Sequence, residues 1–368
     1  MASILAAIFW AITGILFMAS VLPFSKIPHG AIRSLAFPRE QLFILTILMM
    51  IVALFFLDPR PRIYALAILA VAALVHTGYI VKFTPLWTSQ SVDASQEERA
   101  DADNRVSILA ANVKQSNRQF DKLIDLIKAE QPDIATALEV DQEWVDSLYE
   151  ALKQDYPHWI KEPLDNSYGM VLMSKMALSE TQVRDLLVED VPSIKTRVRM
   201  PSGAQWRLYI VHPEPPVPYH NTKGRDGEIA LVGIEAGEDS LPAIVTGDLN
   251  DVAWSTTTRR FQRLSGMLDP RVGRGFYNTF HASYPFARWP LDHLFHDPEF
   301  RLISMARMPD INSDHFPIMF SLALTGTEEA NSTPEDSDPD ERDEVRQIVE
   351  DEKKADREAI GTDWEKED

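Results

Sequence analysis

Three long apolar runs near the start of the chain restrict its fold more than any other feature. Ala2 to Phe24 and Gln41 to Leu57 contain no charged residue, and Ile63 to Val81 is apolar or small apart from one histidine. A helix of roughly 17 to 25 residues crosses the hydrocarbon core of a bilayer, and each run has such a length. Buried helices of soluble proteins rarely occur as three such runs in succession. The sequence therefore predicts three membrane-spanning helices, with a lipid bilayer as partner through residues 2–83.

Basic residues beside these runs give two opposite indications of membrane orientation. Four lie on the side of the downstream chain and two on the other side, a count that favours a cytoplasmic downstream chain. The compact turn at residues 58–62 is instead typical of a cytoplasmic connection, which would place the downstream chain outside. We expect a multi-pass protein of the plasma (inner) membrane, and the side of the downstream chain stays open. The residues counted are Lys26, Arg33, Arg39 and Lys82 on one side and Arg60 and Arg62 on the other.

Composition separates an acidic tail from the rest of the chain. The formal net charge is −19, and the tail from Thr325 holds 18 Asp and Glu against 6 Lys and Arg, which leaves −7 for residues 1–324. Such dense charge with few apolar residues predicts disorder, with at most a fraying charged helix over residues 345–359. The chain has no cysteine, which excludes disulfides, thiolate metal sites and a cysteine nucleophile.

The chain divides by these criteria into four parts. Residues 90–104 are polar, with many Ser, Asp and Glu, and are typical of a linker. We expect a three-helix transmembrane anchor at 1–84, the linker at 85–104, a soluble domain at 105–324 and an acidic disordered tail at 325–368.

In the soluble domain, a buried strand is followed by two polar side chains at alternate positions. The apolar run from Ala243 to Val245 precedes Gly247, and Asp248 and Asn250 come next. Residues two apart on an extended chain point to the same side, so a carboxylate and a carboxamide leave the strand together. The pair suits a catalytic or binding site, and it is also typical of a simple Asp/Asn turn.

Other expected strands end in the same manner. Residues 106–113 and 133–140 predict strands on either side of a helix at 120–129, and they end near Asn112 and Glu139. If the two strands are parallel neighbours, these side chains lie at the same sheet edge. Alternatively, Asn112 is a turn residue at the end of its strand and Glu139 begins the next helix.

Three more titratable positions fit this pattern. His212 ends an expected strand and precedes a proline-rich loop, Asp292 lies in an apolar strand, and Asp314-His315 opens the last buried strand. His212 and the Asp314-His315 pair also have a purely structural interpretation, as side chains that hydrogen-bond a loop. From Ser255 to Arg288 the chain carries six arginines and one aspartate, which would attract a phosphate-bearing substrate or form a solvated surface.

Together these motifs resemble the endonuclease/exonuclease/phosphatase family. Gly247-Asp248-Leu249-Asn250 matches its GDxN motif, and Ser313 to Ile318 matches its SDHxPI motif. Leu291-Asp292-His293 is similar to the preceding aspartate-containing strand, and Tyr168 to Ser174 to its central strand. The resemblance spans residues 105–324. It implies an α/β fold, a four-layer sandwich of two mixed β-sheets flanked by helices, preceded here by the three transmembrane helices.

The resemblance also implies a metal site. Glu139 would be the main ligand, with Asn112 and Asp314 beside it. Carboxylate and carboxamide oxygens suit a hard divalent ion, so Mg²⁺ is expected, with Mn²⁺ as the alternative.

The same resemblance implies the catalytic residues. Asp248 would orient or deprotonate the attacking water, and Asn250 and His212 would donate hydrogen bonds to phosphate oxygens. His315 would hold a phosphate oxygen or assist proton transfer, with Asp292 setting its tautomer and charge.

The function expected from the sequence is a membrane-anchored, metal-dependent hydrolase of phosphodiesters, nuclease-like on DNA or RNA. The alternatives are a phosphodiesterase or phosphatase for phospholipid or inositol-phosphate head groups, and a non-catalytic membrane receptor for a phosphorylated ligand. Three spans without an intramembrane carboxylate disfavour a transporter. The expected partner is a phosphate-bearing substrate, and the sequence indicates no protein partner.

Overall fold

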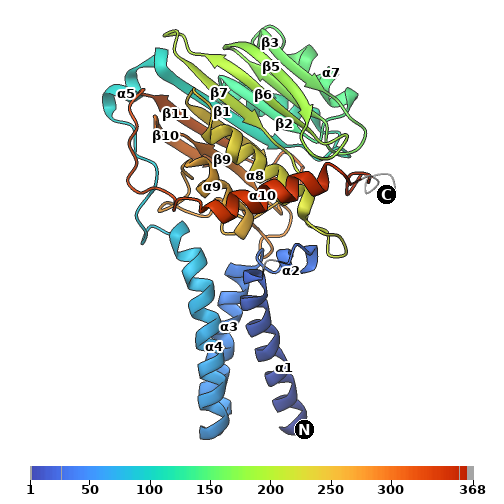
Figure 1. Ribbon diagram of the computed structural model, residues 1–368, viewed down its shortest axis with the longest axis vertical. Helices are drawn as coiled ribbons and strands as arrows, with labels where there is room; N and C mark the ends of the chain where they lie inside the picture. Colours follow the sequence, from blue (N-terminus) through green and yellow to red (C-terminus); the bar gives the residue numbers. More distant parts are fainter. Residues whose placement is uncertain (1, 26, 356, 363–368) are drawn as a thin grey trace.

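The protein consists of a helical stem joined to a larger α/β body, as the computed structural model shows (Figure 1). It describes residues 2–25, 27–355 and 357–362. Lys26, counted above for orientation, lies outside the described residues, as do Met1 of the anchor and Asp356 and residues 363–368 of the tail.

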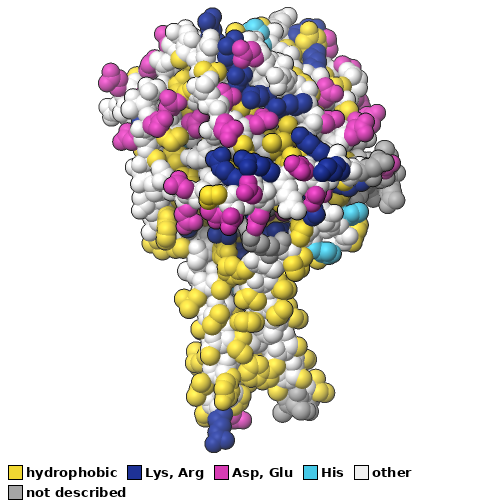
Figure 2. All heavy atoms as spheres, in the orientation of Figure 1, with side chains coloured by type: hydrophobic (Ala, Val, Ile, Leu, Met, Phe, Trp, Pro, Cys, Tyr) yellow, Lys and Arg dark blue, Asp and Glu magenta, His cyan; other side chains and the backbone are white. Residues whose placement is uncertain are grey.

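Three long helices form the stem: α1 (Ala2–Val21), α3 (Arg39–Phe56) and α4 (Pro59–Ile80). Apolar side chains cover its surface, whereas charged side chains of both signs cover the visible face of the body (Figure 2). The segments Ile4–Phe24, Arg39–Phe56 and Pro59–Phe83 are long and apolar enough to cross a membrane. Their contacts with one another bury small and branched residues such as Leu16, Ala53 and Leu69.

Two mixed sheets build the body. In the first, β1 and β2 are parallel neighbours and the other pairs are antiparallel. Its strand order is β10 (Phe300–Arg307), β11 (Ile318–Leu324), β1 (Arg105–Asn112), β2 (Ile134–Leu138), β4 (Met170–Ser174) and β3 (His158–Glu162).

The second sheet repeats this arrangement with one parallel pair, β7 with β8. Its strand order is β5 (Ala177–Asp185), β6 (Pro192–Arg199), β7 (Gln205–Ile210), β8 (Ala243–Asp248) and β9 (Asp292–His296).

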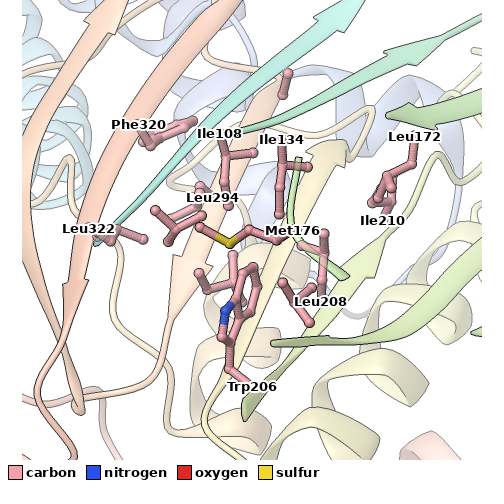
Figure 3. Packing of buried hydrophobic residues seen from close by; sticks show 14 of the residues in the cluster. Ile108, Ile134, Leu172, Met176, Trp206, Leu208, Ile210, Leu294, Phe320 and Leu322 are labelled. Atoms are coloured by element: carbon pink, nitrogen blue, oxygen red, sulfur yellow. The ribbon is translucent and has the colours of Figure 1, made fainter. Parts of the chain in front are cut away.

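The main core lies between the two sheets. Figure 3 shows Ile108, Leu172 and Phe320 of the first sheet facing Trp206 and Leu208 of the second. Alternate side chains of these strands point to the opposite face of each sheet. Those outer faces are also apolar and therefore need a cover.

Helices cover both outer faces. The amphipathic helices α6 (Phe120–Glu130) and α7 (Gln142–Leu152) pack on the first sheet through residues such as Leu123 and Trp144. On the second sheet, α8 (Lys223–Gly237) and α9 (Thr256–Ser265) pack through residues such as Ile229 and Phe261. The order helix, sheet, sheet, helix confirms the expected four-layer sandwich.

The expected linker at 85–104 is folded against the body. Gln90 is buried and its Oε1 accepts from the Asp269 backbone N–H at 2.9 Å. Ser91 is also buried, with its hydroxyl 2.7 Å from His296 Nε2. A short helix, α5 (Gln96–Ala100), follows, with a capping box at Ser95. Polar composition predicted a linker here, and in the structure buried partners far along the chain satisfy several of its polar groups.

The acidic tail also differs from the expectation of disorder. Helix α10 (Pro339–Glu352) packs along α8, as Figure 1 shows, and buries Val345 against Ala230 and Leu264. Arg263 holds Glu341 with two hydrogen bonds of 2.5 and 2.9 Å. Basic side chains of the body therefore neutralise part of the tail.

Stem and body share a hydrophobic cluster, which we call the junction cluster. It contains Ala36 between α1 and α3, Phe83 after α4, and Trp254, Val272 and Leu291 of the body. The Trp254 indole N–H donates to the Ala36 carbonyl at 2.7 Å. The stem is thus packed against the body rather than joined to it by a loose connection.

Candidate active site

The polar residues predicted at strand ends meet at one edge of the sandwich. They come from the ends of β1, β2, β7 and β8, the start of β9 and the segment before β11. A pocket of about 710 Å³ lies there. Six predicted residues line it, namely Glu139, His212, Asp248, Asn250, Asp314 and His315, while Asn112 and Asp292 lie buried behind them.

Glu139 follows β2 directly and lies beside Asn112 of the parallel strand β1. The Asn112 amide donates to Glu139 Oε1 at 2.6 Å and to Asp248 Oδ2 at 3.1 Å. Burial, together with the nearby Asp314 carboxylate, raises the pKa of Glu139 to about 8. Its backbone has φ of +61°, a left-handed conformation that costs non-glycine residues energy and is enriched at functional sites.

Asp248 ends β8 as the residue after Gly247. Its Oδ1 accepts from the Asn250 backbone N–H at 2.9 Å, and its Oδ2 lies 3.4 Å from His315 Nε2. Burial raises the pKa of Asp248 to about 7, against the opposing effect of His315. Gly247 has φ of +140°, and a Cβ there would lie 2.0 Å from the Val211 carbonyl oxygen. Only glycine permits this close approach of β8 to Val211, which directly follows β7 and precedes His212.

His315 and Asp292 form a buried pair. Nδ1 of His315 lies 2.8 Å from Asp292 Oδ2, which leaves Nε2 directed toward Asp248. Burial lowers the pKa of His315, but Asp292, Asp248 and Asp314 together raise it well above the usual value. The raised pKa favours the protonated His315 ring, which lies next to the Asp248 carboxylate.

His212 lies after β7 and faces the same carboxylates. Its Nε2 is 4.0 Å from Glu139 Oε1 and 3.9 Å from Asp248 Oδ2. Burial and the charge of His315 lower the pKa of His212 to about 3, so the ring is neutral at physiological pH. A neutral imidazole can donate one hydrogen bond and accept another.

Asn250 ties two loops of the site together. Its side-chain amide donates to the Pro213 carbonyl at 2.9 Å, next to His212. Its backbone carbonyl accepts from the Arg225 side chain at 3.0 Å. Its backbone is left-handed, with φ of +51°. The side chain lines the pocket and retains a second amide hydrogen and its oxygen for a ligand.

Two neighbouring sets of side chains are candidates to hold a metal ion. By distance, Asp248, Asp292 and His315 have ligand atoms within 4.8 Å of one another. In that set the imidazole is already paired with Asp292 and carries positive charge. Glu139 and Asp314 instead bring two carboxylates together, and the Asp314 charge adds to the effect of burial in raising the pKa of Glu139. The chemistry of the donor atoms therefore fits a divalent cation at Glu139 and Asp314. The Asn112 amide oxygen instead accepts from the Lys114 backbone N–H at 3.0 Å, and its amide nitrogen faces Glu139.

Several pocket residues were not predicted. Lys114 and Tyr168 line the pocket, and the Tyr168 ring lies 5.3 Å from the His212 ring. Both follow or open predicted strands, so the same strand-end criterion would have found them. Ser34, Phe37 and Pro38, from the connection between α1 and α3, also line the pocket, and no local sequence pattern indicates this.

None of the six arginines between Ser255 and Arg288 lines the pocket, which differs from the expectation of a phosphate-attracting segment beside the site. Its arginines have partners elsewhere: Arg259 with Tyr79, Arg260 and Arg263 with Glu341, Arg271 with Asp269, Arg274 with Asp93, and Arg288 with the carbonyls of His281 and Ala282. Among the described residues that line the pocket, Lys114 is the single lysine or arginine.

Comparison with known proteins agrees with this architecture. The sequence model of the Endonuclease/Exonuclease/phosphatase family matches residues 108–315. A solved family member from Bacteroides thetaiotaomicron is 17% identical with a TM-score of 0.50, over 61% of this chain and 97% of that chain. D. rerio TDP2, solved with a single-strand DNA product, is 16% identical with a TM-score of 0.50, over 60% of this chain and 100% of that chain.

A third solved structure, an endonuclease/exonuclease/phosphatase from Beutenbergia cavernae DSM 12333, is 18% identical with a TM-score of 0.50, over 60% of this chain and 72% of that chain. At these identities the structural likeness concerns the fold alone. No curated protein matches the chain.

Proposed function

This chain belongs to the endonuclease/exonuclease/phosphatase family, and from that premise we propose that it is a membrane-anchored, metal-dependent phosphoesterase acting on phospholipid head groups. Phosphoester hydrolysis is the activity type of the family. The membrane anchor and the lipid substrate are the additions proposed for this chain.

The choice of substrate rests on one observation: the segment between α1 and α3, which joins two candidate membrane spans, forms part of the pocket wall. Ser34, Phe37 and Pro38 line the pocket together with Glu139. Pro38 directly precedes Arg39, the first residue of a candidate membrane span. A pocket in this position opens near the bilayer surface, where phospholipid phosphates lie.

Contacts on both sides of the pocket support this arrangement. The Ser34 hydroxyl donates to the Pro216 carbonyl at 3.1 Å, in the loop that follows His212. The Trp289 indole donates to Gln41 Oε1 at 3.3 Å, from the other side of the site. These contacts hold the pocket against the start of the second candidate span, which supports the proposed position of the pocket at the bilayer surface.

The charge of the pocket favours the lipid over the nucleic acid that the sequence suggested first. Binding of DNA or RNA draws much of its free energy from several lysines and arginines along the phosphate backbone. The arginines of the 255–288 segment are paired elsewhere, as described above. Aromatic and apolar side chains, including Phe37, Phe280 and Trp289, form much of the pocket wall instead.

The residues of the site can each perform one part of the hydrolysis. Asp248 accepts the proton of the water that attacks phosphorus, while the phosphorus–oxygen bond to the leaving group breaks. Neutral His212 and the Asn250 amide donate hydrogen bonds to the phosphoryl oxygens. His315, oriented by Asp292, donates to the phosphoryl or departing oxygen.

Glu139 and Asp314 would hold the metal ion, and the Asn112 amide would keep Glu139 in place through its hydrogen bond. When bound, Mg²⁺ supplies a Lewis acid that withdraws charge from the phosphate and lowers the pKa of water.

The test uses the full chain reconstituted in vesicles of phosphatidylcholine, phosphatidylethanolamine and phosphatidylglycerol. Release of phosphorylated head groups is measured with Mg²⁺ and with EDTA, beside a bis-aryl phosphodiester and a single-stranded oligonucleotide. We expect lipid cleavage that EDTA abolishes and that Glu139→Gln and Asp248→Asn each lower by about 10³-fold or more. Glu143→Gln, at an exposed position of α7, is the matched control.

The outcomes separate the two parts of the proposal. If no substrate is cleaved, the chain is not a phosphoesterase under these conditions and the receptor alternative gains support. If the oligonucleotide is cleaved and no lipid is, the family activity stands and the lipid substrate is wrong.

A further inference from the structure

A second cavity, of about 550 Å³, lies where α4 meets the body. Leu74, Val75 and Gly78 of α4 form one wall, and Arg259 and Gln262 of α9 belong to the opposite one. None of the residues that line it also lines the catalytic pocket. The cavity is therefore a separate site, which we call the junction cavity.

The junction cavity begins within a candidate membrane span. Leu74 is 72% exposed on α4, and Phe24, at the end of the first span, is 54% exposed. Lys82 lines the cavity near the end of the span Pro59–Phe83. An apolar wall in the bilayer thus leads to a basic group at the level of the lipid phosphates.

Two cations of the cavity have only neutral partners. Arg259 donates to the Tyr79 hydroxyl and the Ser255 carbonyl, each at 3.2 Å. Lys82 Nζ lies 5.8 Å from the centre of the Trp87 ring. Within the described residues, no carboxylate lies within ion-pair distance of either. Arg263 differs, because Glu341 holds it.

A third cation increases the positive charge beside the cavity. The Arg39 and Arg259 guanidinium groups lie 3.9 and 4.6 Å from the centre of the same Tyr79 ring. Arg39 is buried, and its Nε and Nη1 have no hydrogen-bond partner among the described residues. Unpaired buried charge is costly, so an anion at this place would stabilise the protein.

We propose that the junction cavity binds one anionic phospholipid of the adjoining leaflet. The phosphate would lie between Lys82 and Arg259, and the acyl chains would run along the exposed face of α4. The cavity is also lined by residues 332–335 of the tail, so the lipid would hold stem, α9 and tail together. This inference rests on the proposed membrane insertion and is independent of the catalytic activity.

The test measures thermal unfolding of the full chain in a neutral detergent. Glu139→Gln is used throughout, so that the probe lipid is not hydrolysed. Phosphatidylglycerol is titrated and compared with phosphatidylcholine and with water-soluble glycerophosphoglycerol. We expect phosphatidylglycerol alone to raise the unfolding midpoint, by roughly 5 °C at saturation.

Two variants locate the effect. Lys82→Gln and Arg259→Gln should each weaken the apparent affinity for phosphatidylglycerol by about 10-fold. Arg60→Gln is the matched control, because Arg60 is an exposed cation at the far end of the stem. Arg259 also supports α9, so Lys82→Gln is the decisive variant if Arg259→Gln fails to fold.

Equal shifts with both phospholipids would overturn the proposal, and so would equal weakening by Arg60→Gln and Lys82→Gln. A shift with glycerophosphoglycerol as large as that with the lipid would identify a site for free anions instead. Flotation of the same chain with vesicles is run in parallel. Absence of flotation would refute membrane insertion and this inference together, whereas flotation without lipid selectivity would refute this inference alone.

Discussion

At the scale of single residues, the site stands out by its backbone as well as by its charges. Lys114, Glu139 and Asn250 all have positive φ, between +51° and +61°, although none is glycine. Each such residue costs roughly 1–2 kcal/mol. Hydrogen bonds within the site, such as that of the Lys114 backbone N–H to Asn112 Oδ1 at 3.0 Å, oppose this cost. The strained turns aim side chains of neighbouring strands at one pocket.

The buried pair of His315 and Asp292 leads to the first prediction. In Asp292→Asn, the amide can present a hydrogen to His315 Nδ1, which disturbs the orientation and tautomer of the ring. We expect kcat for phosphodiester cleavage to fall by about 10²–10⁴-fold with little change in KM. Steady-state kinetics of the full chain measures both.

Asp125→Asn, at an exposed position of α6, is the control and should leave both constants unchanged. A rise in KM without a fall in kcat would contradict the positioning role of Asp292.

Gly247 provides a prediction about stability. In Gly247→Ala the methyl group meets the Val211 carbonyl oxygen at 2.0 Å, so β7 and β8 must separate. We expect a loss of more than about 3 kcal/mol in the free energy of unfolding, or failure to fold.

Gly203→Ala is the matched control, because Gly203 has φ of +92° but nothing within 4 Å of an added Cβ. That variant should lose only about 1 kcal/mol, the cost of the backbone conformation. Equal unfolding midpoints for the two variants would show that the close approach of β7 and β8 does not constrain residue 247.

At the scale of elements, contacts with distant parts of the chain hold the acidic tail against the body. The helix α10 lies on α8, and the residues after it reach the catalytic pocket, which Ile360 and Gly361 line. Arg357 holds Glu214 with two hydrogen bonds of 2.7 Å, and Glu214 is 2% exposed. The tail is thus fastened two residues from His212.

Removal of this fastening should release the tail. Arg357→Ala leaves the buried Glu214 carboxylate without its guanidinium partner, which costs about 2–3 kcal/mol locally. We expect several-fold faster proteolysis after residue 352, measured by limited digestion of the full chain.

Arg346→Ala, whose side chain is 71% exposed, should digest at the wild-type rate. Equal digestion of all three proteins would mean that Arg357 does not hold the tail.

At the scale of the whole molecule, stem and body depend on each other through the junction cluster. Removing residues 1–84 would expose the sides of Trp254, Val272 and Leu291 that now contact Ala36 and Phe83. It would also remove Phe37 and its neighbours from the pocket wall.

We therefore expect a chain starting at residue 85 to self-associate and to bind an apolar dye, because such an exposed apolar surface is unfavourable in water. Size-exclusion chromatography with light scattering, with the full chain in the same detergent as reference, measures this. A monodisperse monomer that retains full lipid hydrolysis would refute the dependence of the body on the stem.

Much of the sandwich followed from local sequence patterns. The strands near residues 106–113 and 243–248 and the helix at 120–129 were predicted, because apolar spacing reports which face of an element is buried. The strand-end criterion also brought together Asn112, Glu139, His212 and Asp248. Strands β3 and β5, with mixed or exposed side chains, lack that periodic signal and were not predicted.

By itself, the sequence determined the three membrane-length helices and the set of polar residues at the strand ends, because each follows from the spacing of residues along a short stretch. The four-layer α/β class was expected from the resemblance of its motifs to a known family. Only the tertiary structure decided the partners of the charged residues: Arg263 with Glu341 of the tail, and Arg357 with Glu214. It also placed Phe37 in the pocket wall. Such contacts join positions far apart in the chain, and the free energy of a charged or apolar side chain depends on what the fold brings beside it.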